Sequence, residues 1–156
     1  MKPLNRIAII DVEGQLATID PNGRALRPLS NGGYFYQFPA WSPDGQSIAV
    51  IGTEERRGGI FIADEPHQPY SGVRSIYESQ RQQPFYLYWS PDSRQITFAA
   101  NHPREGIGLH IVPAGGGSSV SRLLDVGRPY FWAWGEDNQS LFVHSGGGDA
   151  KGRLAF

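Results

Sequence analysis

The stretch Trp41-Ser42-Pro43-Asp44-Gly45 returns 48 residues later as Trp89-Ser90-Pro91-Asp92-Ser93, and 45 residues further on in the divergent form Trp134-Gly135-Glu136-Asp137-Asn138. Serine is favoured at the first position of a type I β-turn, and proline presets the backbone angle of the second. Each copy is therefore predicted to close a hairpin and to fix the register of its two strands. The third copy has lost the serine and the proline, so we expect its turn to be looser.

Short runs of β-forming residues surround each copy of this turn. An aromatic run precedes it, at residues 34–40, 85–88 and 130–133, and an apolar run follows it, at 47–51, 95–99 and 140–143. A third run lies at 60–63 and 109–112, and a fourth at 73–77 and 120–124. Such runs, bounded by turn residues, predict strands, and no segment shows the sustained apolar period of a helix.

The two ends of the chain are out of phase with its middle. Residues 7–10, 16–20 and 25–29 align with the second, third and fourth strands of the repeat, while 130–143 supply a first and a second strand and 151–156 open a third. We divide the chain into a partial unit (6–30), two full units (34–79 and 84–126) and a partial unit (129–156). Four-stranded units of this period are typical of β-propellers. The prediction is an all-β fold, a single partial β-propeller over residues 1–156 with about three to three and a half antiparallel blades.

The WSPDG turn before an apolar strand, repeated at this spacing, resembles the PD40 (TolB-like, WD40-like) β-propeller repeat. The likeness covers nearly the whole chain, counting the partial units at its ends. The resemblance implies an architecture but no single activity, because such propellers occur as protein-binding modules, as accessory domains of prolyl-oligopeptidase-type serine peptidases, and as polysaccharide lyases.

Composition and charge narrow the possible partners. The formal net charge is −1, with 14 basic and 15 acidic residues, so no electrostatic footprint for nucleic acid is visible. No apolar stretch approaches the length of a membrane span, and the apolar run at 7–10 is too short for a signal-peptide core. We expect a cytoplasmic protein from the sequence as written, with a periplasmic location open for a longer gene product. The absence of cysteine excludes disulfide and thiolate chemistry.

Catalytic signatures are missing from the sequence. There is no G-x-S-x-G nucleophile elbow, and none of the four histidines has metal-ligand spacing. The glycine runs at 115–119 and 146–151 do not match a phosphate-binding loop. We therefore expect no catalytic, metal or cofactor-binding residue and no enzymatic activity in this chain. If the chain is a peptidase propeller, the catalytic domain lies outside it.

Two sets of residues are singled out. Trp41, Trp89 and Trp134 are expected to be wedges between neighbouring blades, because one tryptophan buries about 150–250 Å². Pro43, Asp44, Pro91 and Asp92 are assigned to the repeated turn that fixes each hairpin. The second set would lie on the face formed by the loops between second and third strands and between one unit and the next, which we call the loop rim. Its predicted residues are Tyr34, Tyr36, Arg56, Arg57, His102, Arg104 and Tyr130, with Glu54, Glu55, Gln82, Gln83, Glu105 and Asp149 around them.

Tyrosine and arginine are enriched at interface hot spots. The leading interpretation is a non-enzymatic scaffold that binds a protein or peptide through the loop rim. The alternatives are the accessory N-terminal propeller of a prolyl-oligopeptidase-type peptidase and a polysaccharide-active propeller. Closed propellers have about 4–8 blades. Completion of the ring would therefore need either further blades from a longer chain or a second copy in a homodimer.

Overall fold

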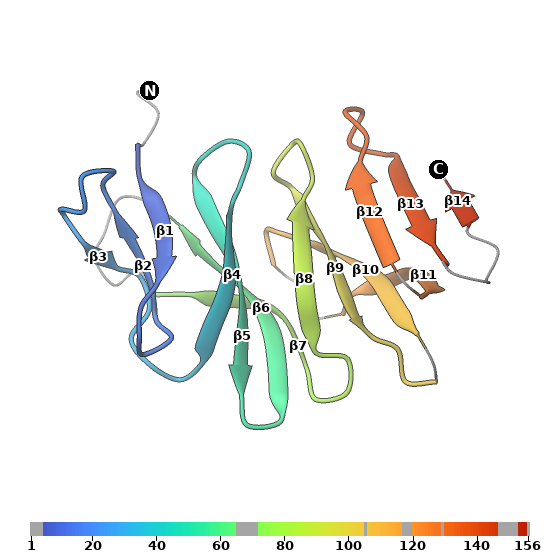
Figure 1. Ribbon diagram of the computed structural model, residues 1–156, viewed down its shortest axis with the longest axis horizontal. Coiled ribbons are helices and arrows are strands. Elements are labelled where there is room, and N and C mark those ends of the chain that lie inside the picture. The colour runs from blue at the N-terminus through green and yellow to red at the C-terminus, as the bar shows by residue number, and fades with distance from the viewer. Residues whose placement is uncertain are drawn as a thin grey trace.

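The computed structural model describes residues 5–64, 72–104, 106–116, 120–128 and 130–146, and the backbone of 153–155. These residues form strands and turns, with no helix among them. They are arranged as four antiparallel sheets in the orders β1-β2-β3, β4-β5-β6-β7, β8-β9-β10-β11 and β12-β13-β14. Figure 1 shows the sheets following one another along an arc, with β4, β8 and β12 standing side by side. The predicted all-β partial propeller is confirmed.

The strand bounds follow the repeat closely. The first sheet contains β1 (Ile7–Ile10), β2 (Leu16–Ile19) and β3 (Arg27–Pro28), and the second contains β4 (Phe35–Trp41), β5 (Ser47–Glu54), β6 (Arg57–Asp64) and β7 (Arg74–Ser79). The third contains β8 (Pro84–Trp89), β9 (Gln95–Asn101), β10 (Ile107–Pro113) and β11 (Arg122–Gly127), and the fourth contains β12 (Tyr130–Trp134), β13 (Leu141–Ser145) and β14 (Arg153–Ala155).

Two strands differ from the sequence expectation. The strand expected at 25–29 shrinks to β3, because Pro28 has no amide hydrogen for the ladder and Ala25 has a φ of 51°. The polar loop expected after residue 51 is instead strand on both sides, closed by a tight turn at Glu55 and Arg56. Gly59 lies in this extension, where an added Cβ would sit 2.5 Å from the carbonyl oxygen of Tyr77. The glycine therefore reflects close packing of β6 on β7 rather than a loop.

Apolar clusters fill the spaces between consecutive sheets. One cluster joins the first and second sheets around Leu16, Tyr36 and Val50. A second joins the second and third sheets around Ile51 and Phe98, and a third joins the third and fourth sheets around Leu109, Trp132 and Val143. Neighbouring residues of β5 thus point into different clusters, and the middle of the strand is buried on both faces, as stacked blades require.

The repeated turn has the same hydrogen-bond pattern in its first two copies. The amide of Gly45 donates to the carbonyl of Ser42 over 2.8 Å, and Ser93 donates to Ser90 over 3.0 Å. The Ser42 hydroxyl donates to Asp44 and accepts the amide of Ser47. Three polar groups are thereby satisfied inside one turn, and the strands on both sides are held in register.

The third copy keeps the turn by a different route. Its equivalent bond, from Asn138 to Gly135, is longer at 3.4 Å. Asp137 compensates by accepting the hydroxyl and the amide of Ser140 and the amide of Gln139. These bonds, led by the one from the Ser140 hydroxyl, lower the pKa of Asp137 to about 2. The third turn is therefore looser only in the main-chain hydrogen bond from Asn138 to Gly135.

The residue after the aspartate is left-handed in every copy, with φ of 71° at Gly45, 62° at Ser93 and 59° at Asn138. A Cβ at Gly45 would meet no atom within 4 Å. Gly45→Ala is therefore expected to lower the free energy of unfolding by about 1 kcal/mol, and only because alanine disfavours the left-handed backbone. Urea unfolding measures this cost. Gly115→Ala is the control, because Gly115 also has open space but lacks the left-handed conformation. Equal stability of the two variants would contradict this explanation.

Candidate functional site

The four strands of the second sheet bring polar side chains together at the loop rim. Tyr34 precedes β4, Glu54 ends β5, Arg57 begins β6 and Glu78 lies near the end of β7. The Tyr34 hydroxyl donates to Glu78 Oε2 over 2.8 Å. The Arg57 guanidinium lies 3.2 Å from Glu54 Oε2 and 3.6 Å from Glu78 Oε2. One arginine is therefore held between two carboxylates.

The electrostatics of this cluster keep Tyr34 and Arg57 each in one protonation state. Partial burial, followed by the hydrogen bond to Glu78, raises the pKa of the Tyr34 phenol. The pKa of Arg57 is also raised, first by Tyr34 and then by its bond to Glu54 and the charge of Glu78. Tyr34 stays neutral and Arg57 stays charged at physiological pH. The Arg57 side chain remains 50% exposed, so it is oriented but still available to a partner.

Backbone contacts tie the adjoining loops to this cluster. Gln83, in the loop between β7 and β8, donates its side-chain amide to the carbonyl of Arg56 over 2.6 Å. The Tyr77 hydroxyl donates to the carbonyl of Gln82 over 2.9 Å. The turn after β5 and the loop after β7 are thus linked into one edge, as the propeller arrangement of loops requires.

The remaining predicted rim residues divide into two groups. His102 and Arg104 lie in the turn between β9 and β10, on the next sheet, and Arg104 is exposed. Tyr36 is 1% exposed and Tyr130 is 7% exposed, so the expectation that they line a surface is wrong. Tyr36 points into the core against the ring of Phe61, at 5.6 Å. Glu105 and Asp149 lie outside the described residues.

Tyr130, like Tyr36, is buried because its ring packs into an apolar cluster between two sheets. Its ring belongs to the cluster between the third and fourth sheets, and its hydroxyl donates to Asp125 Oδ2 over 2.9 Å. Glu78 is the member of this side-chain cluster that sequence reasoning missed. It follows a strand expected to end at Tyr77, and nothing in the sequence indicates that β7 continues far enough to place its carboxylate beside Arg57.

His110 is the most deeply buried histidine among the described residues. It is 3% exposed and stacks on Phe98 with ring centroids 5.1 Å apart. Its Nδ1 lies 3.1 Å from the Ser121 hydroxyl, while its Nε2 has no hydrogen-bond partner. Burial lowers the pKa of His110, and the charge of His102 lowers it further. His110 is a neutral core residue and has no exposed nitrogen for catalysis.

Protonation of His110 is expected to destabilise the fold in acid. The unfolded chain takes up the proton near pH 6.5, and the folded chain does so at a lower pH, so stability is lost as pH falls through this window, by up to about 1.4 kcal/mol per pH unit. His110→Phe keeps an aromatic ring beside Phe98 and removes the titration. Urea unfolding at about pH 7.5 and about pH 5.5 should show a smaller acid loss in the variant than in the wild type. Equal losses would contradict the assignment.

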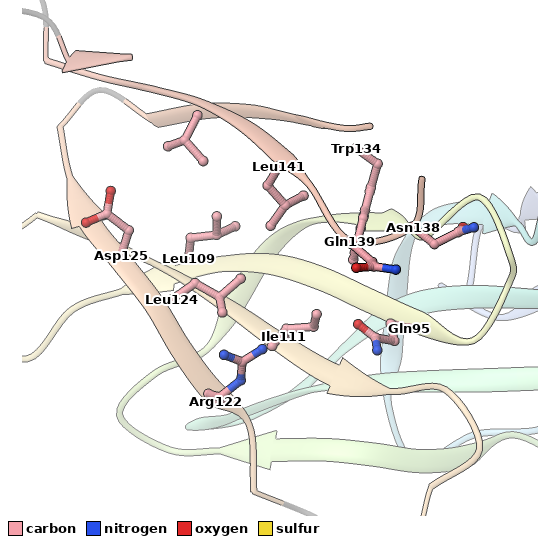
Figure 2. A pocket seen from close by; sticks show the side chains of 11 residues that line it. Gln95, Leu109, Ile111, Arg122, Leu124, Asp125, Trp134, Asn138, Gln139 and Leu141 are labelled. Atoms are coloured by element: carbon pink, nitrogen blue, oxygen red, sulfur yellow. The ribbon is translucent and has the colours of Figure 1, made fainter. Parts of the chain in front are cut away.

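A cleft of about 670 Å³ separates β9–β11 from β12–β13. Leu109, Ile111 and Leu124 form one side, and Leu141 and Trp134 the other, as Figure 2 shows. Arg122 and Asp125 are the charged residues among its described lining. Among the described lining residues, no nucleophile lies beside a base. Within the described part of the chain, no group of three or more His, Cys, Asp or Glu is placed to hold a metal ion. None of the described segments forms a helix that could span a membrane.

Comparison with solved structures identifies the class of fold. The chain is similar to TolB from Acinetobacter baumannii, with 18% identity and a TM-score of 0.66 over 90% of this chain and 34% of that one. It is also similar to a puromycin-hydrolyzing peptidase of Mycobacterium tuberculosis, with 20% identity and a TM-score of 0.64 over 90% of this chain and 24% of the peptidase. An acylaminoacyl peptidase of Pyrococcus horikoshii matches with 14% identity and a TM-score of 0.62 over 97% of this chain and 30% of that enzyme.

These matches show a β-propeller fold of the kind found in TolB and in the two peptidases. The chain spans about a quarter to a third of the length of these structures. No family model matches the sequence, and no curated protein matches it. The PD40 assignment of the repeat therefore stays a prediction.

Proposed function

We propose that the chain is a non-enzymatic propeller module that binds a protein or peptide through its loop rim. The observation that supports this most is Arg57, a half-exposed arginine held between Glu54 and Glu78. A side chain oriented before binding loses less conformational entropy when a partner arrives. Arginine and tyrosine are also the residue types in which interface binding energy concentrates. The partner expected here carries a carboxylate that can replace a carboxylate of the rim beside Arg57.

Affinity capture with immobilised protein tests the loop rim. Arg57→Ala should reduce the recovery of a specific partner about tenfold, while the fold is kept because exposed ion pairs contribute little stability. The matched control is Arg94→Ala, an exposed arginine in the turn between β8 and β9 at the opposite end of the blades. A partner retained by the Arg57 variant and lost by the Arg94 variant would overturn the proposal.

The second candidate is the accessory propeller of a prolyl-oligopeptidase-type peptidase. Its support is the similarity to two peptidases over at least 90% of this chain. Reading the complete gene distinguishes the candidates. A downstream α/β-hydrolase segment with G-x-S-x-G would favour the peptidase, and a continuation as propeller repeats alone would favour the binding module.

A further inference from the structure

The first strands of the second, third and fourth sheets (β4, β8 and β12) carry an aromatic surface that lies apart from the Arg57 cluster. Phe38 on β4, Tyr86 and Tyr88 on β8, and Phe131 on β12 are between 40% and 63% exposed. Their strands stand side by side along one side of the arc (Figure 1). Aromatic groups gathered on an exposed surface in this way mark binding sites more often than scattered ones do.

This surface contains two adjoining hollows. One, of about 340 Å³, lies between β4 and β8, with Phe38 and Trp41 on its β4 side. The other, of about 390 Å³, lies between β8 and β12, with Phe131 and Trp132 on its β12 side. Tyr86 and Tyr88 line both hollows and form the ridge between them. The lining of both hollows, as far as the described residues go, contains no charged, carboxylate or amide side chain.

The rings of the ridge pack on one another, and the ridge carries hydroxyl groups. The rings of Tyr86 and Tyr88 meet edge to face at 5.2 Å, and both pack edge to face on Trp132, at 5.9 and 5.4 Å. Their hydroxyl oxygens lie 3.0 Å apart. One of the two hydroxyl protons is used in that bond, so the other can be donated to an acceptor on a ligand. This bond, followed by burial, raises the pKa of Tyr88, so the Tyr88 phenol is neutral at physiological pH.

We propose that these two hollows bind a proline-rich, uncharged segment of a partner protein in the polyproline II conformation. Proline has no amide hydrogen, and a polyproline II helix makes no internal hydrogen bonds, so such a segment presents carbonyl acceptors that need donors. The ridge supplies a hydroxyl donor, and the hollows supply aromatic walls for proline rings. Polyproline II segments dock in aromatic-lined grooves elsewhere because the peptide is already ordered.

The dimensions and the lining agree with this occupant. Ring contacts of 6.2 Å from Phe38 to Tyr86 and 5.9 Å from Tyr86 to Trp132 make a continuous row. That row extends over at most about 12 Å from Phe38 to Trp132, the length of about four polyproline II residues at ~3.1 Å each. An oligosaccharide would also stack on aromatic rings, but the described lining offers no carboxylate or amide side chain to bind its many hydroxyls. The inference does not depend on the loop rim.

Titration with N-acetylated, C-amidated decaproline, followed by calorimetry, tests the proposal on the whole chain. Saturable binding of decaproline is expected, with none for a glycine–serine peptide of equal length or for cellohexaose. Phe131→Ala should weaken binding about tenfold. The double variant Tyr86→Phe, Tyr88→Phe keeps the rings and should weaken it several-fold through loss of the hydroxyls. Phe142→Ala, a half-exposed aromatic of the same sheet that lines neither hollow, should leave binding unchanged.

Other outcomes overturn the inference. Binding of cellohexaose without decaproline would assign the surface to carbohydrate, and binding of neither would show that something else, such as a second copy of the chain, covers it. Equal effects of Phe131→Ala and Phe142→Ala would place the peptide elsewhere. Arg57→Ala should leave decaproline binding unchanged, so failure of the loop-rim proposal and failure of this one are distinguishable.

Discussion

Trp89→Ala is expected to lower the free energy of unfolding by about 3–5 kcal/mol, the usual cost of deleting a large buried aromatic side chain. Trp89 belongs to the cluster between the second and third sheets, among Ile51, Leu87 and Phe98. Its indole Nε1 donates to the carbonyl of Ala40 on the neighbouring sheet over 3.0 Å. The substitution thus removes both the filling between two blades and a hydrogen bond that connects them.

Trp89→Phe separates these two contributions. It retains most of the ring and loses the bond to Ala40, so the expected cost is about 1–3 kcal/mol. Both variants are measured by urea unfolding at neutral pH. A loss below that of Gly45→Ala would contradict the view that the repeated tryptophan stabilises the contact between blades.

Thr97→Val is expected to cost about 2–3 kcal/mol although it changes almost no volume. The Thr97 hydroxyl is fully buried and accepts the indole N–H of Trp132 at 2.8 Å and that of Trp134 at 3.1 Å. It also donates to the carbonyl of Tyr88 at 3.3 Å. One hydroxyl on β9 therefore satisfies two tryptophans of the next sheet, and valine leaves their donors without an acceptor.

Thr97→Ser is the matched control, because it keeps the hydroxyl and loses one methyl group. It should cost clearly less than Thr97→Val. The double variant Thr97→Val, Trp132→Phe should be less destabilised than the sum of the single variants, because the indole donor is then absent. Additive losses would mean that the hydrogen bond contributes nothing to the contact between the sheets.

The architecture could be predicted from the sequence because its determinants are local and repeated. The turn beginning at Ser42 is set by residues that contact one another within the turn, and its recurrence at Ser90 marks the phase of the repeat. Even the divergent third turn keeps an aspartate, Asp137, at the equivalent position. A local rule that recurs at a fixed spacing is enough to place whole blades.

The candidate site depends on information that is not local. Tyr36 and Tyr130 were assigned to the surface from their place in the repeat, but the face that a strand residue takes depends on register. In β4 the register shifts between Gln37 and Ala40, and Phe38 within this bulge has a φ of 54° and is exposed. The bulge has no distinctive sequence pattern. Glu78 joined the site only through the length of β7, which is set by pairing with β6.

The two proposed surfaces differ in chemistry. The loop rim offers a charged group, Arg57, held by carboxylates, whereas the hollows beside Tyr86 and Tyr88 offer neutral aromatic walls. A partner that carries both an acidic residue and a proline-rich segment would engage both surfaces. Engagement of the second surface would then be intramolecular, and the overall affinity would exceed that of either contact.

Hydrogen–deuterium exchange of the chain, alone and with its captured partner, tests the loop rim most directly. We expect added protection in the segments 34–36, 54–58 and 78–83, which meet around Arg57, and unchanged exchange in the turns at 42–46 and 90–94. Protection confined to those turns, with the segments around Arg57 exchanging as in the free chain, would contradict the account.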